Sequence, residues 1–376
     1  MNIQQASRFL QVQGKVVGEF EREDIFNDNI IKGFICRQSD YRYGAMIICK
    51  INDEECEQVI WGTPKLHYPF DKNGKYNWPA INQLEIYEKL DGTNILAYHY
   101  KYKDKDFVSF KTRLGPVVSD MAFGNFRSMW IEYYEDNDWI KDIIKLNPDY
   151  NLSFELFGER NLITVFYDFP LEVNLLFGIH QNRHSIRPPS QLKLTTETKI
   201  APKSTIKTFD DLTKLYNDFR KDSSELIKKN DLVTEGNVFY VHSDKWHMYK
   251  CKPEEIEKIH WAAGGGIPKI SLWNTIINAF EDIDNPTMDD IEELLLEEYT
   301  KEQIIKSRKK FEKFYKKALK DMEFKKKVNE AWAKARAAGF DIREDKRKTM
   351  RFLSEFFDKH EMRKVGSTIL KQAKLI

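Results

Sequence analysis

A change of sequence pattern near residue 264 is the feature that most limits how this chain can fold. Before that point, short apolar runs such as GKVVGEF, GAMIICKI and VNLLFGIH are separated by turn-like segments such as SDYRYG and NDEE. Such runs predict β-strands joined by turns. Beyond HWAAGGGIPK the pattern is almost wholly helical. We therefore predict an α+β protein in which an antiparallel β-rich body is followed by an all-helical region.

The same change of pattern suggests how the 376 residues divide into domains. We predict a β-rich N-terminal segment over 1–65, a larger β-rich domain over 66–263, a Gly-rich linker over 264–268 and a helical domain over 269–376. Helical patterns interrupt the strands of the larger domain, for example over 208–230.

The composition is that of a folded chain, with 41% hydrophobic and 32% charged residues. The four cysteines, Cys36, Cys49, Cys56 and Cys251, form no CxxC pair and no zinc-like spacing, so we expect free thiols in a reducing compartment. The N-terminus lacks the apolar core of a signal peptide, and no run approaches the roughly 18 apolar residues of a membrane span. These observations predict a cytoplasmic protein without a membrane partner.

The formal net charge of +1 conceals a strong asymmetry. Residues 301–376 contain 24 Lys and Arg against 11 Asp and Glu, a surplus of +13 that leaves −12 for the first 300 residues. A basic block beside a mildly acidic body is typical of a nucleic-acid contact, but it also fits a solvated helical face.

The stretch YEKLDGTNILAYHY places Lys89 two residues before an Asp-Gly pair. Asp-Gly between alternating apolar residues is a strong signal for a β-hairpin turn. A hairpin rarely needs a lysine just inside its incoming strand, so Lys89 is either a solvated surface charge or a nucleophile held beside the turn.

Several other predicted strands carry charged residues on one face. WHMYKCK places Lys250 and Lys252 on the same side, where they repel each other unless an anion lies between them. EGNVFYVHSDKWHMYK predicts a hairpin that places Glu235 and Lys250 in neighbouring strands of one sheet. Glu155 stands in an apolar strand and therefore needs a cationic or metal partner. Arg113 ends another strand, where it suits bidentate phosphate binding. Together these residues suit a nucleoside triphosphate with a divalent metal.

Between residues 80 and 255 the chain resembles the covalent nucleotidyltransferase superfamily of ATP-dependent ligases and mRNA capping enzymes. It resembles most closely the RNA ligase 2-type branch of bacteriophage and kinetoplastid RNA-editing ligases. The resemblance rests on five motifs in the family order, followed by KCK (250–252): EKLDGTN (88–94), RLGPV (113–117), FELFG (154–158), LLFGI (175–179) and EGNVF (235–239).

This resemblance implies a role for each matching residue. Lys89 would take AMP from ATP, with Lys250 and Lys252 as further catalytic residues. The remaining roles are nucleotide contact for Glu88, Asp91, Asn94, Arg113 and Lys250, ribose and metal contact for Glu155, stacking on adenine for Phe177, and metal binding for Glu235. We expect nearby cations to disfavour the charged form of the Lys89 amine and so to lower its pKa. Asp91 and Gly92 would form the tight turn beside the ribose.

The sequence departs from the branch pattern at three positions and leaves one register open. Asp91 stands where the branch often has histidine, Thr112 where it tends to have lysine, and Gly178 where it has aspartate. Glu159, four residues after Glu155, is an alternative third-motif carboxylate, although we favour Glu155.

The function that the resemblance implies is an ATP-dependent RNA ligase that uses Mg²⁺ or Mn²⁺. It would join a 5′-phosphate to a 3′-OH through a lysyl-AMP and an RNA-adenylate, with RNA ends as substrate and end-healing enzymes as candidate partners. DNA ligases and mRNA guanylyltransferases share the lysine motif but typically carry arginine where Asn94 stands. A catalytically inactive RNA-binding relative is the remaining alternative.

The basic helical region is expected to contact RNA phosphates. Phe311, Phe314, Tyr315 and Leu319 recur at helical spacing within it, which is typical of a core, docking or dimer contact. We expect deletion of 301–376 to spare Lys89 adenylylation but to weaken end sealing. Residues 1–65 either extend the main sheet or form a small RNA-binding module, and WGTPKLHYPF (61–70) has no assigned role.

Overall fold

The computed structural model describes most of the chain. The residues left out of the description are 39, 72–73, 121–124, 162–164, 183, 206–210, 229–233, 254–265, 268, 284, 297–298, 300, 343 and 373–376. The predicted linker over 264–268 therefore lies largely outside the described residues, as do both ends of the helix predicted over 208–230. Among the described helices, none has the length and apolarity that a membrane crossing requires.

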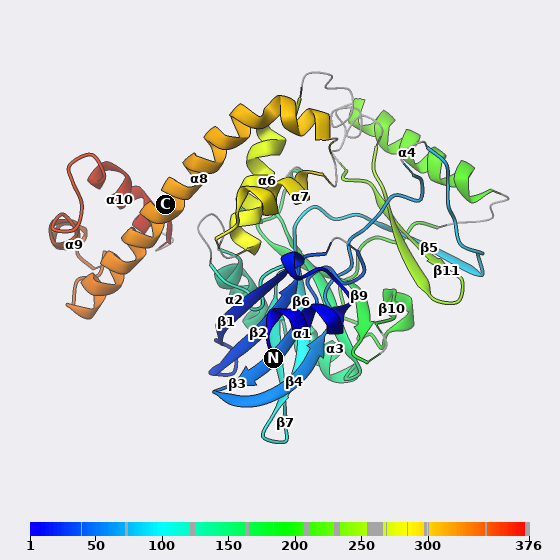
Figure 1. Ribbon diagram of the computed structural model, residues 1–376, viewed down its shortest axis with the longest axis horizontal. Coiled ribbons are helices and arrows are strands. Elements are labelled where there is room, and N and C mark those ends of the chain that lie inside the picture. Colours follow the sequence, from blue (N-terminus) through cyan, green and yellow to red (C-terminus); the bar gives the residue numbers. More distant parts are fainter. Residues whose placement is uncertain are drawn as a thin grey trace.

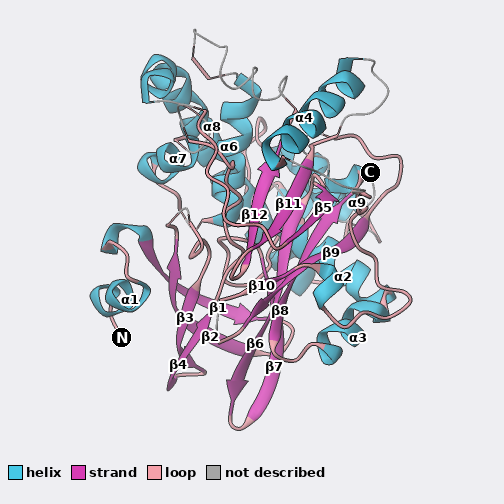
Figure 2. Cartoon of the chain, turned by 90° about the vertical axis from the view of Figure 1, so that its right-hand side faces the viewer, coloured by secondary structure: helices cyan, strands magenta, loops and turns pink. Residues whose placement is uncertain are grey.

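Three antiparallel sheets form the body of the protein (Figures 1 and 2). Their orders are β1-β2-β3-β4, β10-β9-β8-β6-β7 and β12-β11-β5. The strands are β1 Val17–Asp24, β2 Asn29–Cys36, β3 Met46–Ile51, β4 Glu54–Ile60, β5 Gln83–Glu88, β6 Thr93–Tyr102, β7 Lys105–Lys111, β8 Tyr150–Phe157, β9 Glu172–His180, β10 Ile186–Arg187, β11 Asn237–His242 and β12 Trp246–Cys251. The antiparallel β-rich body predicted from the sequence is confirmed.

The four-stranded N-terminal sheet packs on the body through a shared core. Phe20 and Ile31 from β1 and β2 lie in one buried cluster with Tyr98 and Tyr100 of β6. Helix α1 (Ile3–Leu10) covers the other side of this sheet, and the Asn2 side chain caps its N-terminus. The sequence predicted only strands here, so α1 was missed. The strands of residues 1–65 form a sheet of their own, so they do not extend the main sheet but pack on the body through these shared contacts.

A buried carboxylate fastens this N-terminal sheet to β6 and β7. Asp24 is fully buried and accepts hydrogen bonds from the Tyr100 hydroxyl at 2.7 Å, the Ser109 hydroxyl at 2.8 Å and the Asn27 amide at 2.8 Å. Buried polar groups that lose their partner are costly, so this cluster joins the two sheets specifically.

We expect Asp24→Ala to lower the free energy of unfolding by about 3 kcal/mol, because two buried hydroxyls lose their acceptor. Urea unfolding followed by circular dichroism measures this change. Glu19→Ala, at an exposed position of β1 in the same sheet, is the matched control and should leave the unfolding midpoint almost unchanged. Equal effects of the two substitutions would contradict a fastening role for Asp24.

Helices cover the outer faces of the other two sheets. Helices α2 (Phe126–Asp136) and α3 (Asp138–Leu146) bury Trp130 and Ile140 against the five-stranded sheet. Helix α4 (Leu212–Lys228) packs Tyr216 against Phe239 of the three-stranded sheet. The inner faces of the two sheets meet in a further apolar cluster that contains Tyr87, Phe177, Tyr240 and Met248.

The helical region contains two cores joined by one long helix (Figure 1). Its helices are α6 Lys269–Asp282, α7 Met288–Leu295, α8 Lys301–Ala337, α9 Lys346–Leu353 and α10 Met362–Gln372. The first half of α8 packs on α6 and α7, and this core includes the predicted stripe of Phe311, Phe314, Tyr315 and Leu319. The second half of α8 packs on α9 and α10, with Val328 and Leu353 in their core. The predicted apolar stripe is therefore internal packing.

Candidate active site

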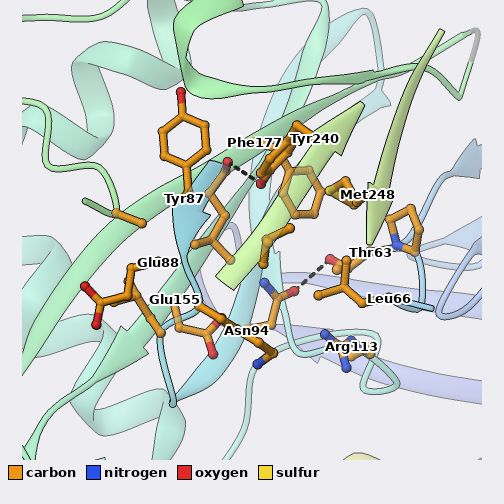
Figure 3. A pocket seen from close by; sticks show the side chains of 16 residues that line it. Thr63, Leu66, Tyr87, Glu88, Asn94, Arg113, Glu155, Phe177, Tyr240 and Met248 are labelled. Atoms are coloured by element: carbon orange, nitrogen blue, oxygen red, sulfur yellow. Dashed lines mark hydrogen bonds between the residues drawn. The ribbon is translucent and has the colours of Figure 1, made fainter. Parts of the chain in front are cut away.

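A pocket lies between the five-stranded and the three-stranded sheets (Figure 3). It is lined by Thr63, Pro64, Leu66, Tyr87, Glu88, Lys89, Leu90, Asn94, Arg113, Glu155, Leu176, Phe177, Ala201, Val238, Tyr240 and Met248. Polar side chains, among them Asn94, Glu155 and Arg113, gather at one end, whereas Phe177 and Tyr240 lie at the other. An apolar pocket with a few convergent polar groups is the usual form of a small-molecule site.

Lys89 lies where the chain passes from one sheet to the other. Strand β5, which precedes it, pairs with β11 of the three-stranded sheet, whereas β6, which follows, pairs with β7 and β8 of the five-stranded sheet. The Asp-Gly pair is therefore not a hairpin turn, and that prediction is wrong. The Lys89 amide donates to the Gly236 carbonyl at 2.9 Å, which anchors the crossing to the start of β11.

The Lys89 amine forms an ion pair with Glu235, and Lys252 pairs with the same carboxylate at 3.1 Å. These three side chains are less than 20% exposed. Burial alone would raise the pKa of Glu235, but the charges of Lys89 and Lys252 outweigh it and lower that pKa. We expected cations around Lys89, yet the structure also places a carboxylate directly on its amine.

Glu155 lies in the polar end of the pocket, behind the Lys89 crossing. One of its carboxylate oxygens accepts a hydrogen bond from the Gly92 amide at 3.1 Å. Burial raises the pKa of Glu155 to about 7, although the positive charges of Lys89 and Arg113 lower it. Glu159, the alternative third-motif carboxylate, is exposed in the turn after β8. Only Glu155 of the two therefore lines the pocket.

Arg113 enters the pocket from the segment that follows β7. Its Nε–H is buried and has no hydrogen-bond partner within the described part of the chain. The centre of its guanidinium lies 5.9 Å from the centre of the Tyr43 ring. A buried donor without a partner is unusual in a native structure, and an anionic ligand is a natural partner for a guanidinium.

Glycine is required after Asp91 because the backbone of β8 lies very close. A Cβ atom placed on Gly92 would lie 2.3 Å from the Leu156 carbonyl oxygen. Asp91 itself is buried, and its carboxylate accepts from the Val165 amide at 2.6 Å while its own amide donates to the Tyr167 hydroxyl at 2.9 Å. Asp91 therefore fixes the backbone between β5 and β6, although its side chain does not line the pocket. Its predicted contact with the nucleotide stays a prediction.

Asn94 connects three parts of the pocket wall. Its amide nitrogen donates to the Ser153 hydroxyl at 2.9 Å and to the Phe154 carbonyl at 3.1 Å, and its oxygen accepts from the Thr63 hydroxyl at 2.7 Å. The segment 61–70, which had no assigned role, therefore forms a wall of the pocket next to the motif residues.

Two aromatic side chains line the apolar end of the pocket. Phe177 on β9 and Tyr240 on β11 come from the two different sheets, and the Tyr240 hydroxyl donates to the Leu176 carbonyl at 3.0 Å. Glu88, at the end of β5, lies on the side of Glu155 (Figure 3), and burial raises the pKa of its carboxyl. Adenine stacking on Phe177 and nucleotide contact by Glu88 stay predictions, since both side chains line the pocket.

The hairpin predicted for 235–250 is present, with β11 and β12 paired so that Val238 faces Lys250. Lys252 pairs with the Glu235 carboxylate, which also pairs with the Lys89 amine. Lys250 is buried with its amine 4.4 Å from the centre of the Tyr68 ring. The two lysines therefore contact different neighbours. The Glu235 carboxylate is the anion that pairs with Lys252.

The predicted metal ligands are Glu155 and Glu235. They lie close enough for the charge of Glu235 to raise the pKa of Glu155. No group of three or more His, Cys, Asp or Glu that could hold a metal occurs among the residues that the structure describes. Mg²⁺ in nucleotide sites is typically bound by one or two carboxylates together with phosphate oxygens and water. The pair fits a metal that arrives with a triphosphate.

Comparison with known proteins places ligases among the similar structures. An archaeal ATP-dependent RNA ligase is 14% identical, with 94% of this chain and 90% of that chain covered at a TM-score of 0.46. A putative ATP-dependent DNA ligase from Aquifex aeolicus is 16% identical, with 96% and 89% covered and a TM-score of 0.46. An RNA ligase of Naegleria gruberi, solved with ATP and Mn, is 15% identical over 46% of this chain and 49% of that chain, with a TM-score of 0.35. No family model and no curated protein matches the sequence.

Proposed function

We propose that this chain is an ATP-dependent RNA ligase that joins a 5′-phosphate to a 3′-OH through an AMP bound covalently to Lys89. The observation that carries the proposal is the position of the Lys89 amine. It lies on a pocket between two sheets, paired with Glu235, and the same pocket presents the unpartnered Nε–H of Arg113.

In the first step, the Lys89 nitrogen attacks the α-phosphorus of ATP. A nitrogen–phosphorus bond forms, the bond from that phosphorus to the bridging oxygen breaks, and pyrophosphate leaves. The amine must lose a proton before it attacks, and the Glu235 carboxylate, which pairs with the ammonium, is placed to accept it. Arg113 supplies positive charge for the phosphates. A divalent cation held by Glu155 and Glu235 would neutralise charge on the triphosphate.

In the two later steps, the AMP moves to the nucleic acid and is then released. A 5′-phosphate oxygen attacks the adenylate, the bond from phosphorus to the Lys89 nitrogen breaks, and an A(5′)pp(5′)N end forms. A 3′-hydroxyl then attacks the 5′-phosphate, the strand is sealed and AMP leaves. These steps, and the choice of ATP and RNA, follow from the resemblance at EKLDGTN, where Asn94 stands in place of arginine.

The test is to incubate the purified chain with ATP or GTP labelled at the α-phosphate, together with Mg²⁺, and to separate the protein under denaturing conditions. We expect label from ATP only, followed by sealing of RNA ends that carry a 5′-phosphate and a 3′-OH. Label from GTP would assign the chain to mRNA capping, and sealing of DNA but not RNA ends would make it a DNA ligase. Absence of label after removal of any bound AMP would overturn the proposal.

The helical region supplies basic surface for the RNA. Exposed lysines, among them Lys309, Lys313 and Lys316, follow the outside of α8. Of the surplus of 13 positive charges in 301–376, seven belong to residues 323–376. Lysines that neutralise phosphates release counterions, which gives affinity without sequence preference and makes that affinity fall with salt.

The structure changes where this region should be cut. A deletion from residue 301 would remove Phe311 and Ala318 from the core that buries α6 and α7, so it would expose that core. A cut after Met322 separates the two cores, because Met322 packs with α6 and α7 whereas Phe324 packs with α9 and α10. The deletion predicted from the sequence is therefore unsuitable, and a chain ending at residue 322 takes its place.

We expect the chain that ends at residue 322 to form the Lys89 adduct at the normal rate but to seal RNA ends at least about tenfold more slowly at 200 mM salt. The nucleotide pocket is untouched by the cut, whereas more than half of the positive surplus is lost. Sealing rates measured between 50 and 200 mM salt check this, and the shorter chain should show the weaker salt dependence. Equal sealing by both chains at every salt concentration would exclude a role for 323–376 in RNA contact.

A further inference from the structure

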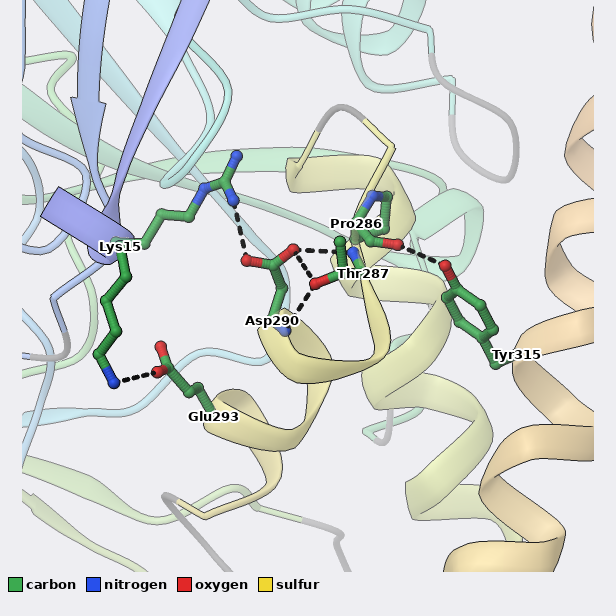
Figure 4. A network of polar contacts seen from close by, with 7 residues as sticks. Lys15, Pro286, Thr287, Asp290, Glu293 and Tyr315 are labelled. Carbon is green, nitrogen blue, oxygen red and sulfur yellow. Dashed lines mark hydrogen bonds and ion pairs between the residues drawn. The ribbon is translucent and has the colours of Figure 1, made fainter. Parts of the chain in front are cut away.

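Helix α7 contacts the N-terminal sheet through its first turn (Figure 4). One oxygen of the Asp290 carboxylate accepts from the amide and hydroxyl of Thr287, at 2.7 Å each, and so closes the start of the helix. The other oxygen accepts from the Arg37 guanidinium at 2.9 Å, and these two side chains are only 22% and 18% exposed. One carboxylate therefore both caps α7 and fastens it to the body.

An apolar contact lies beside this ion pair. Tyr43 and Leu114 of the body are buried in one cluster with Ile283, which follows α6, and Leu294 of α7 packs against them. Leu114 is the residue directly after Arg113. The helical region thus rests on the segment that carries the pocket arginine.

The body holds the backbone of the same segment. The buried Lys111 amine donates to the carbonyls of Thr112 and Arg113 at 2.8 and 3.0 Å. A Cβ atom on Gly44, whose φ is +74°, would lie 1.9 Å from the Arg113 carbonyl oxygen, so only glycine allows this approach. Arg113 is therefore held by its own sheet through the backbone and by the helical region through Leu114.

We propose that the docked helix α7 positions Arg113 for the nucleotide, with Arg37 and Leu294 as positioning residues. The inference rests on the proposed function, because it gives the Arg113 guanidinium a phosphate of ATP as its partner. A guanidinium held in place before the ligand arrives loses less conformational entropy on binding, so docking of α7 increases the affinity for ATP. The helical region would then serve adenylylation as well as RNA contact.

The experiment measures the rate of Lys89 adduct formation against ATP concentration in the full chain. We expect Arg37→Ala and Leu294→Ala each to raise the ATP concentration for half-maximal rate by about five- to tenfold, the lower end of typical coupling between sites. The rate at saturating ATP should not change. Lys15→Ala is the matched control, because its pair with Glu293 at 3.5 Å joins the same two parts of the protein but is 67% and 49% exposed.

Combination with Arg113→Ala separates positioning from a loss of stability. If α7 acts through Arg113, Arg37→Ala should add nothing to Arg113→Ala, and Arg37→Lys should restore most of the ATP dependence. Additive effects, or a lower saturating rate with unchanged ATP dependence, would overturn the inference. If the unaltered chain is labelled and Arg37→Ala leaves the ATP dependence of adduct formation unchanged, the inference alone is wrong. If the unaltered chain is not labelled, the proposed function is wrong.

Discussion

Lys89→Ala is expected to abolish the covalent AMP adduct completely. The amine is the only atom of the side chain that can form the nitrogen–phosphorus bond, and no water can replace a covalent attachment. The substitution should not unfold the site, because Glu235 keeps its ion pair with Lys252 at 3.1 Å. Labelling with α-phosphate-labelled ATP under denaturing conditions measures the adduct.

Lys89→Arg is the sharper companion variant. Arginine keeps a positive charge beside Glu235 but is not a nucleophile at neutral pH. We expect it to bind ATP, measured by calorimetry, within a few fold of the unaltered chain and to form no adduct. An adduct in either variant would show that another residue takes the AMP, with Lys250 and Lys252 the next to replace.

Glu155→Gln is expected to change the free energy of unfolding by about 3 kcal/mol more favourably at pH 8 than at pH 4. The same substitution should weaken adenylylation. Burial raises the pKa of Glu155 to about 7 in the folded chain, against 4.5 for an exposed glutamate. The folded state therefore binds the proton more tightly than the unfolded state. Stability from this group is present below pH 4.5 and is lost as the pH rises to about 7, after which it stays level.

Glutamine removes this titration but still accepts the hydrogen bond from the Gly92 amide. The difference in unfolding free energy between the variant and the unaltered chain should therefore grow between pH 4.5 and 7. Urea unfolding at several pH values measures it, with Glu159→Gln as the exposed control. Parallel pH profiles for the unaltered chain and Glu155→Gln would contradict the raised pKa.

Local sequence patterns predicted the elements well but not their partners. Alternation placed the strands and the β11–β12 hairpin correctly, because both depend on neighbours along the chain. The Asp-Gly pair wrongly predicted a hairpin after Lys89. Asp-Gly suits a tight backbone turn whether the next strand pairs with the preceding strand or joins another sheet, as it does here. Only the packing of Gly92 against the Leu156 carbonyl shows why glycine is needed there.

The site was predictable where motifs mark it and not where it depends on tertiary contact. The motif residues Lys89, Arg113 and Glu155 all line one pocket. Thr63 joins them from 31 positions before Asn94, through a hydrogen bond that no local pattern encodes. Tyr167, whose hydroxyl accepts a hydrogen bond from the Asp91 amide, is likewise distant from Asp91 in the sequence. The docking of α7 depends on Arg37 and Asp290, which are separated by 253 positions.

The crossing at Lys89 also limits how the pocket can open. Residues 89–92 join β5 to β6 in two different sheets, and four residues span at most about 14 Å. At this end the sheets cannot move far apart without breaking the hydrogen bonds of Lys89 to Gly236 and of Gly92 to Glu155. The Tyr240 hydroxyl, which donates to the Leu176 carbonyl, joins the same two sheets at the apolar end. The Lys89 amine therefore keeps its place between the sheets as a nucleotide enters or leaves.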